Sequence, residues 1–266
     1  MKSYFYYGYL AFKTQLMYKS NILFSIVKAF LFFFVQVNLW KGLYAGLGEE
    51  RLAYSLDEML TYQVLSAIIG TFLSETVPMS ILQKDINTGN IMNYLKLPNS
   101  YTGQVFMSSL GKNLFSFFTV SIPLVVVSCL YVPVMFPSST KMCLVAAGAL
   151  LFSVLVYFEI FYLFGMVSFW FLDRYGTMGL LLTNVMRILS GALIPLALFP
   201  NGLRKVVLML PMRYGFDFPI SIYLGKISEK EILSGFLLQA LWVVILWFIN
   251  HNVFKTGLRK LVLQGG

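Results

Sequence analysis

The stretch from Met142 to Leu172 reads MCLVAAGALLFSVLVYFEIFYLFGMVSFWFL, and its one charged residue is Glu159. A helix needs about 20 mostly apolar residues to cross the hydrocarbon core of a bilayer, and this run exceeds that length. It is also too long and too continuous to be a strand of a soluble protein. The stretch therefore predicts a membrane-spanning helix.

Comparable apolar runs lie on both sides of it. The predicted spans are residues 22–44, 59–82, 105–132, 142–172, 177–199 and 236–254. Composition agrees, because 58% of the residues are hydrophobic, 12% are charged and the mean hydropathy is +0.76, whereas a soluble domain is about 25% charged. We expect an all-α membrane protein in which residues 1–266 form a single transmembrane domain with six transmembrane helices.

The N-terminal segment, residues 1–20, is rich in tyrosine and phenylalanine, with Lys13 and Lys19 interleaved. This mixture favours an interfacial helix on the inner leaflet; a plain aromatic flank of the first span is the alternative. Because no small-residue cleavage site follows the first apolar run, we do not expect a cleaved signal peptide.

The distribution of basic residues predicts the orientation. Both the N-terminal segment and the C-terminal tail are basic and lack acidic residues, so the positive-inside rule places both termini in the cytoplasm. Six spans satisfy this requirement. The loop between the fifth and sixth spans contradicts the rule, since it would lie outside and yet carries Arg204, Lys205, Arg213, Lys226 and Lys230.

The net charge of +9 does not predict nucleic-acid binding, because the basic residues lie in the gaps between spans rather than in one patch. His251 is the only histidine, which excludes multi-histidine metal sites. We expect Cys129 and Cys143 to be free, buried thiols, although a bridge between them is geometrically conceivable. No metal site is predicted.

Several motifs are absent. The chain has no G-x-x-x-x-G-K-[ST] loop for nucleotide phosphates and no H-E-x-x-H or G-x-S-x-G motif. Few carboxylates and one histidine leave little for acid–base catalysis. A transport protein is therefore favoured, and the alternatives are a membrane enzyme acting on lipids or an ATP-independent channel or carrier.

Two segments stand out between the spans. Residues 83–101 form a polar loop in which Asp85 or Asn87 could cap a short helix and Pro98 would end it. Residues 189–200 combine apolar side chains with Pro195 and Pro200, which remove backbone donors near one membrane face. The second segment is too apolar for a free loop and too broken for a span, so it predicts re-entrant helices.

These segments carry a resemblance to the permease subunits of type-2 ATP-binding-cassette (ABC) exporters, in particular the compact six-span bacterial branch. In that branch the first cytoplasmic loop carries aspartate, isoleucine, a basic residue, any residue and glycine, followed by leucine and proline. Here Asn87 stands at the basic position. The residues that match are Asp85, Ile86, Gly89, Leu97, Pro98, the pair Phe169-Trp170, the run Ser190-Gly191, Ile194-Pro195 and Phe199-Pro200, and Pro211.

The resemblance implies how such a chain works. Residues 84–101 would form a coupling helix on an ABC ATPase dimer, through Lys84, Asp85, Ile86, Gly89, Leu95, Leu97 and Pro98. Residues 195–225 would form an outer re-entrant gate, with gate residues Ser190, Gly191, Ile194, Pro195, Phe199, Pro200 and Pro211.

The resemblance also implies partners, location and cargo. A second permease, identical or homologous, would complete the path, while ATP and Mg would bind the partner ATPase and no cofactor would bind this chain. The chain would lie in a bacterial plasma membrane. It would move a hydrophobic or amphipathic drug, peptide or lipid out of the cell.

Charges within the spans require an explanation, because a charge at mid-bilayer costs about 2.5–3.5 kcal/mol on insertion scales. The candidates are Glu75, Glu159 and Arg187. We hypothesise an ion pair between Glu159 and Arg187, with either a packing role or a role in the transport path.

Overall fold

The computed structural model describes residues 2–47, 53–73, 77–137, 139–171 and 177–264. Its regular structure is all helical, with no strand among these residues. The α-helices are, in chain order, α1 (Lys2–Gln15), α2 (Lys19–Leu47), α3 (Leu56–Leu73), α4 (Val77–Asn87), α5 (Ile91–Leu95), α6 (Tyr101–Ser116), α7 (Ile122–Tyr131), α8 (Thr140–Gly165), α9 (Thr177–Leu189), α10 (Asn201–Val207), α11 (Asp217–Tyr223) and α12 (Glu229–Gln264).

Five helical stretches of the described chain are long and apolar enough to cross a membrane. They are α2, α3 with α4, α6 with α7, α8, and α12. They coincide with the predicted first, second, third, fourth and sixth spans, so the prediction of an all-α membrane protein is confirmed. The helix α12 has 36 residues and extends beyond the predicted span at both ends.

The predicted fifth span, residues 177–199, is wrong beyond Leu189, because α9 ends there after 13 residues. At 1.5 Å per residue such a helix is about 20 Å long, shorter than the hydrocarbon core of about 30 Å. Beyond it lie a turn, α10, α11 and two short 3₁₀ segments, Leu196–Leu198 and Pro211–Tyr214.

Serine caps begin three of the long helices. Ser55 Oγ accepts from the Glu58 amide while the Glu58 carboxylate accepts from the Ser55 amide, and Ser228 and Glu231 repeat this reciprocal pair before α12. Ser139 caps α8 by accepting from the amide of Met142. Each capping side chain satisfies a backbone donor that the first helical turn leaves free.

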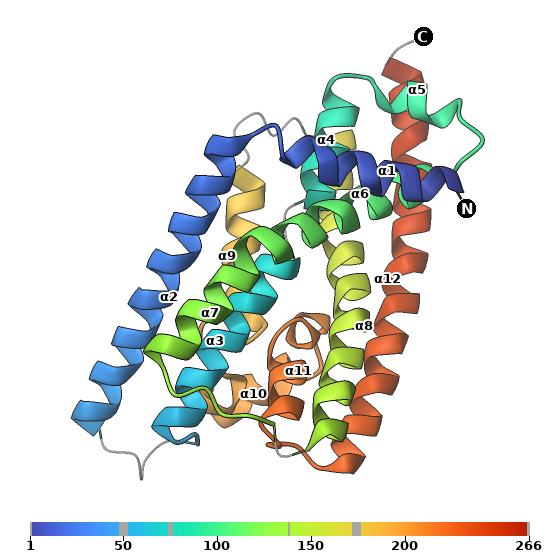
Figure 1. The fold of residues 1–266 in the computed structure, drawn as a ribbon. Helices are drawn as coiled ribbons and strands as arrows, with labels where there is room; N and C mark the ends of the chain where they lie inside the picture. The colour runs from blue at the N-terminus through green and yellow to red at the C-terminus, as the bar shows by residue number, and fades with distance from the viewer. Residues whose placement is uncertain (1, 48–52, 74–76, 138, 172–176, 265–266) are drawn as a thin grey trace.

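The third span changes helical type in its middle. A π-helical turn, Phe117–Ser121, joins α6 to α7, and Pro123 lies in the first turn of α7. A proline inside a helix removes a backbone donor, and a π turn absorbs that break locally. The span therefore bends without ending (Figure 1).

The molecule has two distinct ends (Figure 1). The start of α1, the short helix α5 and the end of α12 lie at one end, which we call the terminal end. The helices α10 and α11 lie toward the opposite end, which we call the α11 end. The start of α1 and the end of α12 thus lie at the same end of the molecule.

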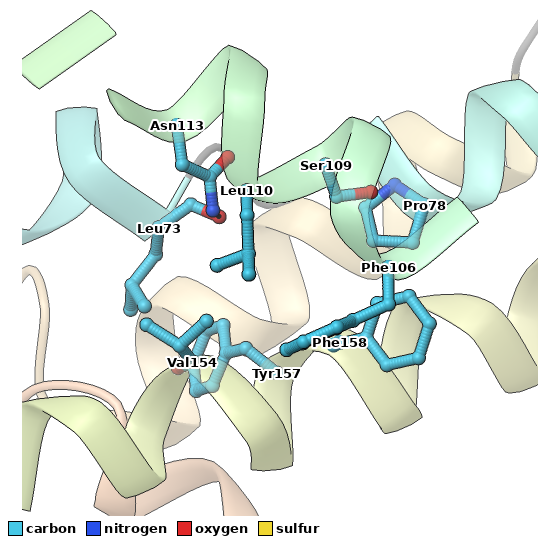
Figure 2. Close-up of a pocket in the computed structure, with 9 residues that line it drawn as sticks. All are labelled: Leu73, Pro78, Phe106, Ser109, Leu110, Asn113, Val154, Tyr157 and Phe158. Carbon is cyan, nitrogen blue, oxygen red and sulfur yellow. Dashed lines mark hydrogen bonds between the residues drawn. The ribbon is translucent and has the colours of Figure 1, made fainter. Parts of the chain in front are cut away.

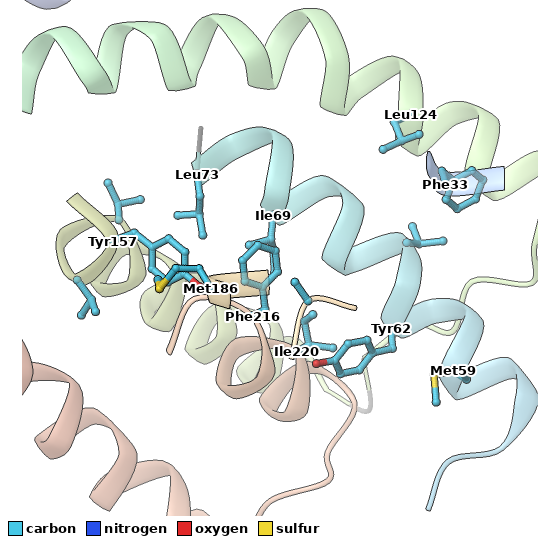
Figure 3. Close-up of a cluster of buried hydrophobic side chains, with 14 of the residues drawn as sticks. Phe33, Met59, Tyr62, Ile69, Leu73, Leu124, Tyr157, Met186, Phe216 and Ile220 are labelled. Carbon is cyan, nitrogen blue, oxygen red and sulfur yellow. The ribbon is translucent and has the colours of Figure 1, made fainter. Parts of the chain in front are cut away.

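Aromatic and aliphatic side chains together form the main core, which includes residues of α3, α8 and α11 (Figure 3). Tyr62, Tyr157 and Phe216 are almost wholly buried there. Gly215 makes this packing possible, because a Cβ on it would lie 2.1 Å from the Tyr157 ring. The core thus holds the broken segment after α9 against the long helices.

The predicted N-terminal helix is present as α1, and it lies across α6 (Figure 1). Two glycines allow the close crossing, since a Cβ on Gly111 would lie 2.1 Å from the carbonyl oxygen of Gly8. The rings of Phe12 and Phe115 pack edge to face at 5.4 Å. The opposite face of α1 exposes Phe5, Tyr6, Tyr9 and Leu10.

Candidate functional sites

The loop between α4 and α6 lies at the terminal end and contains α5 (Figure 1). Gly89 adopts a φ of +72° after the last turn of α4, a conformation that favours glycine. Open space surrounds the position where its Cβ would be. The chain therefore needs Gly89 for its backbone conformation, not for close packing within this chain.

Two predicted contact residues of this loop point into the protein. Asp85 is 7% exposed, and its Oδ2 accepts a hydrogen bond of 2.7 Å from the Tyr101 hydroxyl at the start of α6. Ile86 packs with Leu82 and Ile91 in a buried apolar cluster. Asp85 and Ile86 thus anchor the start of the loop to the protein interior.

Other residues of the loop form its surface. Met92, Leu95 and Leu97 are 44%, 38% and 43% exposed, and Lys84, Gly89, Lys96 and Pro98 are exposed as well. Three apolar side chains among solvated polar residues are typical of a protein interaction surface. We call Met92, Leu95 and Leu97 the α5 surface.

At the α11 end, the turn after α9 is held by side chains from distant helices. Gly191 has a φ of +84°. The Tyr62 hydroxyl donates to its carbonyl at 2.7 Å, and the Ser66 hydroxyl donates to the carbonyl of Ala192 at 2.7 Å. These bonds satisfy two backbone carbonyls of the turn, which lies beyond the end of α9.

Asp217 completes this turn from α11. Its backbone amide donates to the carbonyl of Ser190 at 3.0 Å, and its Oδ1 accepts from the amide of Leu196 at 3.3 Å. The sequence pattern pointed to the glycine and prolines but not to Tyr62, Ser66 or Asp217. To identify these three residues, the sequence analysis would have had to pair the helix break with polar side chains that lie far away in the chain.

The prolines of the predicted gate precede or begin short helical segments. Pro195 precedes the 3₁₀ turn Leu196–Leu198, Pro200 precedes α10, and Pro211 begins the 3₁₀ turn Pro211–Tyr214. Proline suits these positions because its missing amide would have no intrahelical partner there. Among the other predicted gate residues, Ser190 is fully buried, Phe199 is half-buried and Ile194 is exposed.

The largest of the cavities described here, about 770 Å³, lies between α2, α3, α4 and α9. Its lining is mixed, with Phe32 and Leu180 beside Thr183 and Asn184. Cavities of about 300–1,000 Å³ accommodate drug-sized ligands. We call this space the lateral cavity.

A much smaller cavity, about 10 Å³, lies where α6 meets α8 and the end of α3 (Figure 2). Asn113 on α6 donates to the carbonyl of Leu73 at 3.3 Å, beside Leu110 and Phe158. A space of this size holds one water at most. It is a packing feature, whereas the lateral cavity is large enough for a substrate.

The predicted ion pair between Glu159 and Arg187 is wrong. Glu159 on α8 instead accepts a hydrogen bond from Asn250 on α12, and Asn250 Nδ2 also donates to the Glu159 carbonyl at 2.9 Å. The Arg187 guanidinium lies 5.4 Å from the ring centroid of Phe32 on α2. The two charged residues face different helices, which sequence spacing could not reveal.

Replacing Asn250 with leucine is expected to destabilise the protein by about 1–3 kcal/mol, because it leaves the buried Glu159 oxygens without their donor. A lower melting temperature in detergent would show this loss. Asn252→Leu is the matched control, since Asn252 is exposed on the same helix and its side chain donates to the carbonyl of Phe248, within its own helix. Equal melting of both variants would contradict the structural role of Asn250.

Arg187 lines the lateral cavity together with Lys28 of α2. Lys28 escaped the sequence interpretation because it lies within an otherwise apolar run. Its place in the first half of α2 lets a long side chain reach toward the terminal end. Glu75, the third predicted intramembrane charge, lies outside the described residues.

Cys129 and Cys143 are free, as expected, but both are exposed rather than buried. In a membrane protein, exposure of an apolar segment places it against lipid, so these thiols need no protein pocket. They contribute nothing to the sites described above.

Five helical stretches long and apolar enough to cross a membrane are typical of a multi-pass integral membrane protein. The chain matches the model of the ABC-2 family transporter proteins over residues 30–265, and it belongs to this family. It is therefore a permease of an ABC transporter, and members of this family work with an ABC ATPase. The match begins after α1.

No match was found among curated proteins.

Proposed function

We propose that this chain is the transmembrane subunit of an ABC export complex and that the α5 surface docks on a separate ATPase dimer. Family membership supports the permease role, and the exposed Met92, Leu95 and Leu97 carry the docking proposal. In this arrangement ATP and Mg bind the ATPase, and no residue of this chain performs hydrolysis.

The proposed topology has six crossings in a bacterial plasma membrane. The helix α9, together with the turn and short helices at the α11 end, completes the fifth crossing. The terminal end faces the cytoplasm, which is consistent with the basic residues of the N-terminal segment and the C-terminal tail. A second permease subunit, identical or homologous, completes the complex.

The proposed substrate is hydrophobic or amphipathic: a drug, a peptide or a lipid. The lateral cavity supports this class, because its wall combines aromatic and aliphatic side chains with hydroxyl, amide and basic groups. The re-entrant segments at the α11 end form the gate through which the substrate leaves. Closure of the ATPase dimer on ATP shifts the permease between its inward and outward states.

A double variant at the α5 surface tests the docking proposal. Leu95→Asp with Leu97→Asp is expected to reduce co-purification of the ABC ATPase from its own host at least about tenfold, because charges would be buried in an apolar interface. The measurement is quantitative pull-down after co-expression with each candidate ATPase.

Met135→Asp is the matched control, because Met135 is equally exposed and apolar but lies between α7 and α8 at the α11 end (Figure 1). It should leave the amount of captured ATPase unchanged. Full retention of the ATPase by the double variant would exclude the α5 surface as the docking site.

A further inference from the structure

A second cavity, about 320 Å³, lies at the α11 end, remote from the α5 surface. Three parts of the chain enclose it: residues 53–54, the broken segment from Leu196 to Ser221, and residues 226–238, which lead into the start of α12. It is separate from the lateral cavity, with which it shares no lining residue. We call it the α11-end cavity.

Three of the five basic residues that contradicted the positive-inside rule line this cavity. Arg204, Arg213 and Lys226 line it, against two acidic residues, Asp217 and Glu231. Positive charge is normally scarce in external loops of membrane proteins. Its concentration around a cavity indicates a local role that outweighs the topological preference.

Both acidic residues are already engaged within the chain. Asp217 lies 3.9 Å from the Arg213 guanidinium and accepts from the amide of Leu196. Glu231 accepts from the amide and hydroxyl of Ser228 in the cap of α12. Both carboxylates also lie close enough to Arg213 and Arg204 to interact with them electrostatically.

Two of the three cations are fixed in place. Lys226 Nζ lies 2.7 Å from the Glu58 carboxylate and 5.2 Å from the ring centroid of Tyr54. Arg213 donates from Nη1 to the carbonyl of Leu208 at 3.2 Å, while its buried Nε has no hydrogen-bond partner. The chain thus holds Arg213 rigidly without using all of its donors.

Arg204 differs from these two. It is exposed on α10, and it forms none of the ion pairs found between described residues. Its side chain lines the α11-end cavity, whereas its neighbour Lys205 does not. A guanidinium with free donors at a cavity is suited to bind a phosphate through two parallel hydrogen bonds.

The same cavity also has an apolar wall, formed by Leu196, Leu208 and Leu238. The adjacent helix α10 exposes Leu203 and Val206 beside Arg204. Exposed apolar and basic side chains on one helix are suited to a membrane interface, where lipid headgroups meet apolar chains. The ligand that fits both walls has an anionic head and an apolar body.

We propose that the α11-end cavity binds the phosphate group of an anionic phospholipid from the membrane leaflet at that end, with Arg204 as the principal contact. The site would explain why this loop retains its basic residues. The proposal does not depend on the identity of the exported substrate.

The test compares lipid retention by two variants of neighbouring residues on α10. Native mass spectrometry of the purified chain would count bound phosphatidylglycerol in mixed phosphatidylglycerol and phosphatidylcholine nanodiscs. Arg204→Gln is expected to weaken phosphatidylglycerol binding about tenfold, because a charge-assisted bidentate contact is lost. Lys205→Gln, equally exposed but outside the cavity, should retain wild-type binding.

Soluble ligands distinguish a lipid from a free anion. A short-chain phosphatidylglycerol should displace the bound lipid, whereas inorganic phosphate at the same concentration should not. Equal lipid retention by the Arg204→Gln and Lys205→Gln variants would overturn the site. Displacement by inorganic phosphate as effective as by the short-chain lipid would overturn its assignment to a phospholipid.

Discussion

Gly111→Ala is expected to release α1 from α6. The added Cβ would lie 2.1 Å from the carbonyl oxygen of Gly8, 2.8 Å from its carbonyl carbon and 3.0 Å from its Cα, all of which are backbone atoms. Backbone cannot rotate away as a flexible side chain can, so the two helices must separate. Overpacking of this kind costs about 1–3 kcal/mol.

Two measurements check this result. The melting temperature in detergent should fall, and trypsin should cleave faster after Lys13, which is exposed on α1. Separation would also strain the hydrogen bonds from Asn99 to Ser3 and from the Ser100 amide to Tyr4. Faster cleavage after Lys13 would therefore show that α1 has moved away from α6.

Gly42→Ala is the control for this experiment. Gly42 lies in α2, and nothing lies within 4 Å of the position where its Cβ would be. Alanine there should be neutral or stabilise the helix by up to about 1 kcal/mol. If the Gly111→Ala protein melts and resists trypsin like the Gly42→Ala protein, the crossing of α1 and α6 is not as close as described.

Gly191→Ala is expected to be as damaging at the other end of the molecule. The φ of +84° is unfavourable for alanine by about 1–2 kcal/mol. In addition, its Cβ would lie 2.8 Å from the Tyr62 hydroxyl and 2.9 Å from the Asp217 Cβ. The turn would shift and lose the bonds that Tyr62 and Ser66 make to its carbonyls.

The expected readouts are a lower melting temperature and a loss of export by the assembled complex. Gly202→Ala provides the control, because Gly202 lies nearby in α10 and its Cβ position has open space around it. If the two variants were indistinguishable in stability and export, the turn after α9 would tolerate displacement and would not be a rigid part of the proposed gate.

Much of the fold could be predicted from the sequence, because lipid imposes a simple rule on helix length and polarity. The long apolar helices and the N-terminal helix follow directly from that rule. The end of α9 does not, since Leu189 is followed by further apolar residues. Its position is set by Tyr62 and Ser66, whose partners lie 129 and 126 residues away along the chain.

The segments that form the candidate sites could be predicted from the sequence, but the contacts of their individual residues could not. The loop between α4 and α6 was identified by its composition, yet Asp85 is buried because Tyr101 supplies a hydrogen bond that no local pattern reveals. Likewise, the hydrogen bond that joins α8 to α12 is made by Glu159 and Asn250, which lie 91 residues apart in the sequence. Polar pairs across helices depend on rotation about the helix axes, which hydropathy does not specify.

The loop that carries α5 is tied at both of its ends. At the C-terminal end of α4, Asp85 accepts a hydrogen bond from Tyr101. At the other end of the loop, Asn99 and Ser100 donate to Ser3 and Tyr4 of α1. A force applied to α5 is therefore not dissipated by bending of a loose connection. We therefore expect a displacement of α5 to act on α1, α4 and α6 together, through these hydrogen bonds.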